Sequence, residues 1–475
     1  MDFKIGQLKQ TAIFIPCLLL LVFAIKGVLR LFAKWEFCRQ HNCRTPNGAS
    51  SGFLGLGRVA NLLLAMKNCE SLELLRTWHH QHGNTFKTSL GRPVIITIEP
   101  KNVQAVLALK FKDFDLGHRN KAVAPLLGQG IFASDGQIWE HSRALVRPNF
   151  VRNQVSDMNV YERHVSNLIA KIPRDASSVD LQELFFQMTI DSATEFLFGE
   201  SIDSLGAGDD QPAFAKDFKT SQDGLAIRAR LGPLMFLYQD RAFSKSTVEA
   251  RRFVGQFVQQ ALDYRATHTS GSDTLKASEE RYVFLYELSK QTADKKMLTD
   301  QLLNILLAGR DTTASLLSIT CFILARRPDI WNKFREDVLK LGKKAPSFED
   351  PTRTLFSPLG GGPEGKDPVF VPEGHEVLYS VYSMHRLPEV FGPDATEYRP
   401  ERWANLKPGW AYIPFNGGPR ICPGQQFALT EAGYTLIRIA QCFKSIESRD
   451  DRPFKEGLTL TLASENGTKV SLTPG

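Results

Sequence analysis

Residues 415 to 424 read Phe415-Asn416-Gly417-Gly418-Pro419-Arg420-Ile421-Cys422-Pro423-Gly424, and the rest of the chain is interpreted outward from this stretch. A cysteine binds haem iron only as a thiolate, which needs a close macrocycle, shielding from water and N–H donors. The glycines allow a close backbone approach and positive φ, and the prolines stiffen the turn. The apolar period that follows predicts a helix over 425–439, whose dipole favours an anion at Cys422. The stretch therefore predicts a loop that holds a haem through Cys422.

The spacing Phe-x-x-Gly-x-Arg-x-Cys-x-Gly is formed by Phe415, Gly418, Arg420, Cys422 and Gly424. Arg420 is expected to reach a haem propionate or to offset the thiolate charge. The alternative is a buried free cysteine that packs as a small hydrophobe. The loop resembles that of the cytochromes P-450, the haem-thiolate mono-oxygenases. The resemblance implies haem b (iron protoporphyrin IX) as cofactor, with Cys422 as the axial ligand of the iron.

The composition suits a large body with a sizeable core: 475 residues, of which 43% are hydrophobic. The net charge of +7 and the pI near 8.9 come without a long basic block, which favours an acidic protein or a membrane as partner and not nucleic acid. The seven cysteines are scattered without a Cys-x-x-Cys pair, which indicates a reducing compartment and no disulfide framework.

The first 45 residues are predicted to anchor the chain in a membrane. Thr11 to Ile25 is uncharged and mostly apolar, and more basic residues follow it than precede it. By the positive-inside rule, the body of the protein, 46–475, stays in the cytosol. Two alternatives remain open: a cleaved signal peptide, although no small-x-small site follows the run, and an amphipathic helix that lines a pocket.

Trp139 and Arg143 are four residues apart, so they share one helix face from which an indole N–H and a guanidinium can both bond a propionate. A surface arginine beside a half-buried tryptophan is the alternative. The pair resembles the propionate-binding helix of the P-450 family.

A long helix is predicted from about Asp300 to Arg326, capped by Thr299 or Asp300. Its centre, 308–314, interrupts the leucine period with Ala308, Gly309, an acid and two threonines. Threonine hydroxyls that bond the i−4 carbonyl would be the structural explanation. The functional one is that Ala308 and Gly309 pass close over a macrocycle, while Thr312 assists oxygen activation and Asp311 relays protons. The segment resembles the oxygen-activation motif of the same family.

The resemblance covers nearly the whole chain. Within the family, the chain resembles the fungal alkane and fatty-acid hydroxylating branch in residues 132–150, 189–199, 302–314 and 369–403. It implies a mainly α fold with a small β region. The implied activity is NADPH- and O2-dependent hydroxylation of long-chain alkanes or fatty acids at the terminal carbon. The implied setting is the endoplasmic reticulum membrane, with electrons from the flavoprotein NADPH-cytochrome reductase and cytochrome b5 as a further partner.

One departure from the family is expected to matter. Pro400-Glu401-Arg402-Trp403 matches a family element whose arginine pairs with a Glu-x-x-Arg helix, and no Glu-x-x-Arg lies between Pro328 and Glu397. We therefore expect a segment to be deleted near 350–360, which would leave Arg402 without its usual partner. Two rival hypotheses follow: a catalytically inactive, haem-poor membrane protein, or a haem-thiolate sensor.

Smaller patterns complete the sequence analysis. Strands are predicted at 86–90 and 94–98, and a hairpin is predicted to pair 458–462 with 469–472 about Asn466-Gly467. Gly360 to Lys366 has the spacing of a phosphate-binding loop, but Asp367 and Pro368 exclude the helix that such a loop needs. Asn466 begins a glycosylation sequon, which a cytosolic body would leave unmodified.

Overall fold

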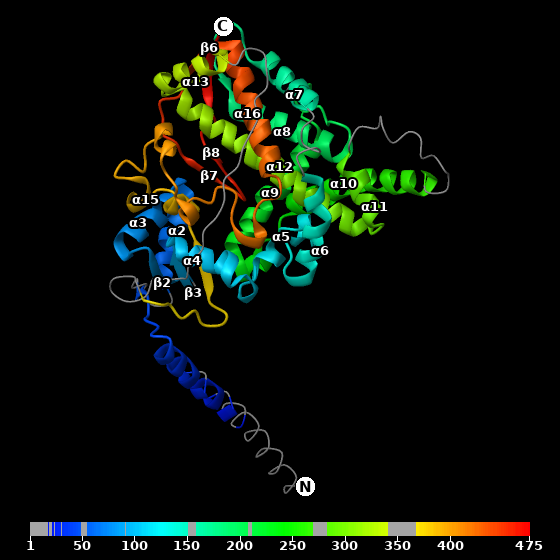
Figure 1. Cartoon of the computed structure of the whole chain (residues 1–475). Helices are drawn as coiled ribbons and strands as arrows, with labels where there is room; N and C mark the ends of the chain where they lie inside the picture. The colour runs from blue at the N-terminus through cyan, green and yellow to red at the C-terminus, as the bar shows by residue number, and fades with distance from the viewer. Residues whose placement is uncertain are drawn as a thin grey trace. The chain divides into compact units, whose positions relative to one another are not determined.

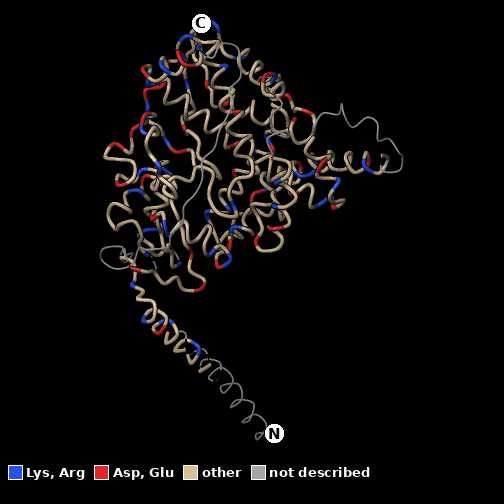
Figure 2. The backbone as a smooth tube through the Cα atoms, in the orientation of Figure 1, with Lys and Arg blue, Asp and Glu red and all other residues tan. Residues whose placement is uncertain are grey.

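The computed structural model describes residues 18, 21–22, 24–29, 31–48, 55–90, 92–150, 158–207, 211–268, 283–340 and 367–475. They form two compact units, each assembled from two stretches of the chain. Unit 1 comprises residues 1–111 and 353–419, and unit 2 comprises residues 112–352 and 420–475. The elements of both are mostly helices (Figure 1), as the sequence predicts. Basic and acidic residues are interspersed along the described backbone (Figure 2).

Unit 2 is built around one long helix, α12 (Lys295–Leu324). It packs against α8 (Leu181–Phe198), α10 (Arg241–His268) and α16 (Gln425–Cys442) (Figure 1). Leu302, Leu303 and Leu306 of α12 are completely buried, so its leucine period does become the core face. The unit also contains α5 (Arg119–Leu127), α6 (Gly136–Val146), α7 (Met158–Lys171), α9 (Ala213–Leu231), α11 (Phe284–Gln291), α13 (Pro328–Lys340) and the 3-10 helices η4 (Arg147–Phe150) and η6 (Gly232–Leu237).

The start of α12 is earlier than the sequence predicts. Asp294 is the N-cap, and its carboxylate accepts a hydrogen bond from the N–H of Met297 at 3.0 Å. The predicted caps are wrong because both side chains bond elsewhere. The Thr299 hydroxyl donates to the Lys295 carbonyl, and the carboxylate of Asp300, only 2% exposed, accepts hydrogen bonds from Arg and Lys side chains.

Unit 1 holds the larger sheet, in strand order β1 (Asn47–Gly48), β2 (Thr85–Ser89), β3 (Pro93–Thr97) and β5 (Glu376–Tyr379). β2 and β3 are antiparallel with Phe86 opposite Ile96, which confirms the predicted strand pair. β5 adds to β3 in parallel. The other elements of the unit are α2 (Leu56–Asn68), α3 (Ser71–His82), α4 (Pro100–Gln104), the π-helix η2 (Ala105–Leu109), α14 (Val381–Met384), α15 (Pro388–Phe391) and short 3-10 turns within 400–419.

Two small sheets complete unit 2 and correct the predicted hairpin. β9 (Lys469–Pro474) lies between β4 (Val179–Asp180) and β6 (Phe443–Ser448), while β7 (Glu456–Leu458) pairs with β8 (Leu462–Ser464). The hairpin closes early because the N–H of Thr459 bonds the Thr461 carbonyl at 2.8 Å. Asn466-Gly467 is a turn, with φ of 75° at Gly467, but it connects strands of different sheets.

The predicted anchor, Thr11 to Ile25, lies mostly outside the described residues. Residues 24–29 and 31–40 are helical, and Val28, Leu31 and Phe32 are more than half exposed. Among the described residues, no helix combines the length and the apolar run that crossing a bilayer requires.

Candidate functional site

The centre of α12 presents one open face on a helix that is otherwise mostly buried. Ala308 is half-buried and Thr312 is exposed, and Leu316 keeps 44% of its surface. Positions four apart share a helix face, so these three residues form a stripe of small and apolar groups. The Thr312 hydroxyl donates to the Ala308 carbonyl at 2.7 Å. The structural explanation of the threonine is therefore confirmed, and its role in oxygen activation stays a prediction.

Gly309 has a different environment from the one that the sequence predicts. A Cβ at this position would lie 3.6 Å from the Cβ of Ala193 on α8, which is an ordinary contact. Gly309 therefore faces α8. The close passage of Ala308 over a macrocycle stays a prediction.

Asp311 is buried, with 4% of its surface exposed, and it is held by two donors. Gln222 of α9 donates to its Oδ2 at 2.8 Å, and Arg310 donates to its Oδ1 at 2.8 Å. Burial raises the pKa of Asp311, and the charge and hydrogen bonds of Arg310 and Gln222 oppose that rise. The acid that the sequence assigns to proton relay is thus a buried carboxyl whose two oxygens are both occupied.

Cys422 is half-buried two residues before Gly424, the N-cap of α16. Burial raises the pKa of its thiol, while the backbone N–H of Gly424 and the charge of Arg143 lower it. The residue after Cys422 is a proline and cannot donate an N–H, so the Gly424 N–H at the helix start is the backbone donor to the sulfur. Burial dominates, so the pKa of the Cys422 thiol lies above its usual range, while the Gly424 N–H and the Arg143 charge are the two groups that favour the thiolate.

Arg420 has another partner than the one expected for it. Its guanidinium bonds Asp135 at 2.6 Å and the Ser134 carbonyl at 2.9 Å, and it lies 4.7 Å from the centre of the Trp139 ring. The cation whose charge acts on the Cys422 thiol is Arg143, from α6. Burial lowers the pKa of Arg420, and Asp135 opposes that shift. Arg420 contacts Trp139, and the charge of Arg143 acts on it, but the bond to Asp135 was not predicted. The binding of haem propionates by these residues stays a prediction.

The first half of the cysteine loop, up to Pro419, belongs to unit 1, where Phe415 is half-buried. Two of its glycines are required by crowding. A Cβ at Gly417 would lie 2.5 Å from the Trp410 ring, and one at Gly418, whose φ is 64°, would lie 1.9 Å from the Leu107 carbonyl oxygen. Side chains at these positions would displace the loop from the body of unit 1.

Comparison with known proteins fits this geometry. The family model for Cytochrome P450 matches residues 52–353 and 364–470. The chain belongs to the cytochrome P450 family. Cytochrome P450 monooxygenase himC of Aspergillus japonicus is 44% identical over 88% of this chain and 81% of its own length. Cytochrome P450 52A13 of Debaryomyces hansenii is 44% identical over 92% of this chain and 93% of its own length, and Cytochrome P450 52A3-B of Candida maltosa is 42% identical over 90% of each.

Cytochromes P450 bind haem b, and the residues of unit 2 fit that group. The open stripe of α12 has small and apolar groups that suit a flat macrocycle, and the thiol of Cys422 is a soft donor of the kind that binds haem iron. Arg143 and the Arg420–Trp139 pair supply cationic and N–H groups for carboxylates. This P450 is therefore an oxidoreductase of the monooxygenase class, with haem as its cofactor.

The match to the P450 family is interrupted between residues 353 and 364, inside the stretch that the structure does not describe. The alignment with the Debaryomyces hansenii protein takes in 488 positions, more than the 475 residues of this chain. That relative therefore carries residues that have no counterpart in this chain, and the deletion near 350–360 stays a prediction.

Arg402 nevertheless has a carboxylate partner within unit 1. Its guanidinium bonds Asp394 Oδ1 at 3.2 Å and the carbonyls of Phe391, Asp394 and Glu397, and its side chain is 8% exposed. The prediction that Arg402 is left without a carboxylate partner is wrong, because Asp394, eight residues earlier in the chain, bonds its guanidinium.

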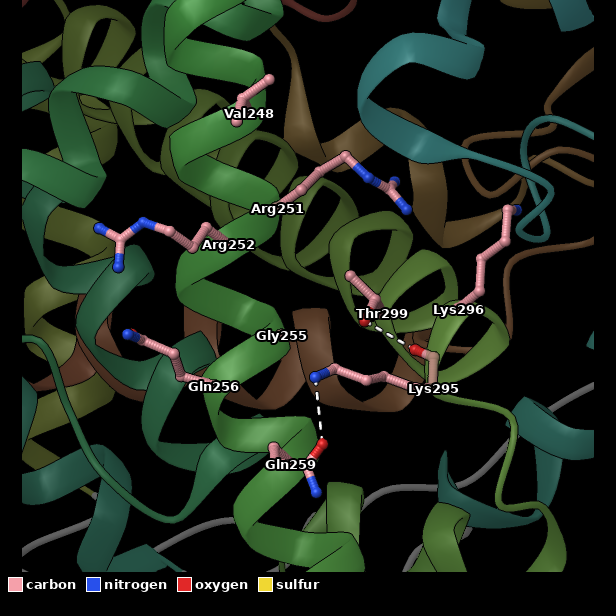
Figure 3. Close-up of a pocket in the computed structure, with 9 residues that line it drawn as sticks. All are labelled: Val248, Arg251, Arg252, Gly255, Gln256, Gln259, Lys295, Lys296 and Thr299. Carbon is pink, nitrogen blue, oxygen red and sulfur yellow. Dashed lines mark hydrogen bonds between the residues drawn. The ribbon is translucent and has the colours of Figure 1, made fainter.

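The structure also contains a groove that the sequence does not suggest (Figure 3). It has a volume of about 680 Å³ and lies between α10 and the first turns of α12. Its cations are already engaged: Arg251 and Lys296 bond the buried Asp300, and Lys295 bonds Gln259 at 3.1 Å. With a rise of about 1.5 Å per residue, Thr299 at this groove is about 20 Å along α12 from Thr312. The groove is separate from the open stripe.

Proposed function

We propose that this P450 hydroxylates long-chain alkanes or fatty acids at the terminal carbon, using O2 and electrons from NADPH. The observation that supports it is the open stripe of Ala308, Thr312 and Leu316, in which a single hydroxyl is set among apolar groups. Such a surface binds an aliphatic chain without leaving polar groups unpaired. The resemblance of 302–314 and 369–403 to the fungal alkane and fatty-acid hydroxylating branch supports the same substrates.

The roles of the residues follow from their positions. Cys422 would hold the iron as a thiolate, with the Gly424 N–H and Arg143 stabilising its charge. Trp139, Arg143 and Arg420 would hold the propionates, and Ala308 and Phe415 would border the macrocycle. When bound, the haem supplies the redox chemistry that inserts one atom of O2 into a C–H bond, the other leaving as water. The second oxygen atom needs two protons, which Thr312 and Asp311 deliver from the protein side.

Cytochromes P450 generally take their electrons from NADPH-cytochrome P450 reductase and bind hydrophobic substrates. We infer that this chain uses that flavoprotein, with cytochrome b5 as an additional donor. We further infer that residues 1–45 attach it to the endoplasmic reticulum membrane by a single helix, with 46–475 in the cytosol. The lipid bilayer would then be the reservoir of substrate.

The decisive experiment supplies the full chain with reductase, NADPH and either a long-chain alkane or a long-chain fatty acid. We expect terminal alcohols as the main products, identified by mass spectrometry. Hydroxylation confined to inner carbons, or of neither substrate, would overturn the proposal. For the location, deletion of residues 1–45 is expected to release protein from microsomes. A glycan on Asn466, detected by endoglycosidase treatment, would reverse the orientation.

A second candidate function is an inactive, haem-poor protein. The interruption of the family match between residues 353 and 364 favours it, as does the relative that carries residues without a counterpart in this chain. The Asp394–Arg402 bond weakens the argument, because it removes the uncompensated charge that would have destabilised the fold. The carbon monoxide difference spectrum of the reduced chain separates the two candidates. A thiolate-type spectrum at stoichiometric haem supports the enzyme, whereas its recovery only after a Glu-x-x-Arg segment is inserted between Asp350 and Gly360 supports the inactive form.

A further inference from the structure

Three side chains from two helices close a ring around the acid of the oxygen-activation motif. Gln222 donates from Nε2 to Asp311 Oδ2 at 2.8 Å, and Arg310 donates from Nη1 to Asp311 Oδ1 at 2.8 Å. The same Arg310 nitrogen donates to Gln222 Oε1 at 2.9 Å. Each member therefore bonds both of the others.

The ring is buried and held from a second side. Gln222 and Asp311 are each 4% exposed, and Arg310 is 9% exposed. The Arg310 guanidinium lies 4.9 Å from the ring centre of Phe186, and Thr189 of α8 donates to the Arg310 carbonyl at 2.9 Å. Charges taken out of water persist only when their polar atoms are paired. Gln222 is thus a neutral partner of both the buried carboxylate and Nη1 of the buried guanidinium, while Arg310 Nε completes no hydrogen bond with any described residue.

We propose that Gln222 of α9 is a positioning residue for Asp311, occupying one carboxylate oxygen while Arg310 occupies the other, so that Asp311 takes up a proton only when the Gln222 amide moves away. The inference rests on the proposed function, because it makes a residue of a second helix control the acid of the proton relay. Proton uptake by Asp311 is then coupled to the position of α9. The sequence offers no sign of this link, since Gln222 and Asp311 are far apart along the chain.

Two charged groups act on Asp311. Arg310, its neighbour on α12, favours the carboxylate, and Asp223 of α9 disfavours it. Removal of the Gln222 amide takes away one hydrogen bond to a charged group and leaves both charges in place. A bond of that kind contributes about 1.5 kcal/mol or more, so the titration midpoint of Asp311 is expected to rise by about one pH unit.

The test uses Gln222→Met, which keeps the side-chain length but removes the amide, and Gln222→Glu, which removes the donor and adds a like charge. Gln301→Met is the matched control, because Gln301 is a buried glutamine of α12 that bonds Ser142 at 2.8 Å and not the ring. The protonated carboxyl of Asp311 is followed by infrared spectroscopy of the full chain, and its band is identified by its loss in Asp311→Asn.

We expect the infrared midpoint to rise by about one unit in Gln222→Met, to rise further in Gln222→Glu and to stay unchanged in Gln301→Met. The pH profile of product formed per NADPH should move in the same direction. An unchanged midpoint in both Gln222 variants would overturn the inference, as would a shifted midpoint without a shifted coupling profile. The infrared result does not depend on turnover. A wild-type chain that forms no alcohol, with the midpoint shift present, would refute the proposed function and leave the placement of Gln222 intact.

Discussion

Glu431→Gln is expected to stabilise the protein at alkaline pH and to leave it almost unchanged at acid pH. Glu431 lies on α16 with 1% of its surface exposed, and the Ser192 hydroxyl donates to its Oε1. Thr313 is near enough to favour the charged form, yet Oε2 and the Thr313 hydroxyl complete no hydrogen bond with any described residue. Burial therefore dominates and raises the pKa of Glu431 from 4.5 to about 7.

The sign follows from proton linkage. A carboxyl whose pKa is raised on folding binds its proton more tightly in the native state, so stability falls as pH increases from 4.5 through 7. The difference between these two pKa values lowers the free energy of unfolding by about 3 kcal/mol above about pH 8. At about pH 5 it lowers it by under about 1 kcal/mol. Glutamine keeps the shape without the charge, so the variant avoids this loss.

The assay is urea unfolding of the wild type and the variant at about pH 5 and about pH 9. Glu447→Gln is the control, because Glu447 is an exposed carboxyl in β6 that contacts Arg449 at 3.6 Å. An equal difference between Glu431→Gln and the wild type at both pH values would refute the account of a buried, charge-destabilised carboxyl.

Three further outcomes are expected. Cys422→Ala should abolish the thiolate-type carbon monoxide spectrum, while Cys442→Ala at the end of α16 should retain it; a retained spectrum in the first variant would remove Cys422 as ligand. Thr312→Ala should keep the free energy of unfolding within about 1 kcal/mol, because its hydroxyl bonds the Ala308 carbonyl in its own helix turn. The variant should release peroxide at the expense of product. An unchanged yield of product per NADPH would mean that Thr312 is only a helix residue. Asp394→Asn should cost about 3 kcal/mol by leaving the buried Arg402 without its carboxylate, whereas breaking the exposed Arg399–Asp394 pair with Arg399→Gln should cost under about 1 kcal/mol; equal costs in denaturant unfolding would contradict that difference.

Periodicity and short-range chemistry were enough to predict the helices at the site. The pattern that predicts each element involves residues only a few positions apart. This holds for the leucines of α12, the apolar period of α16 and the β2–β3 pair. The family motif likewise located Cys422, Thr312 and Asp311 by their order in the chain. Their roles remain predictions, and the experiments above test them.

The partners of those side chains could not be predicted, because each is contributed by a distant stretch. Asp135 bonds Arg420, Gln222 bonds Asp311, and Asp394 bonds Arg402. In each case several acids or amides were available, and tertiary packing selects among them. The hairpin prediction was wrong for the same reason, because β9 pairs with the strands at 179–180 and 443–448 and not with the strand that precedes it in the chain.

The parallel pairing of β3 with β5 has a consequence during synthesis. The strand at 93–97 leaves the ribosome long before its partner at 376–379, and all of α5 to α13 is made in between. At translation rates of about 5 to 20 residues per second, the free edge of β3 waits for tens of seconds. Throughout that interval Val94, Ile95 and Ile96 form an apolar strand without a neighbour on one side, which is the segment that a nascent-chain chaperone would be expected to cover.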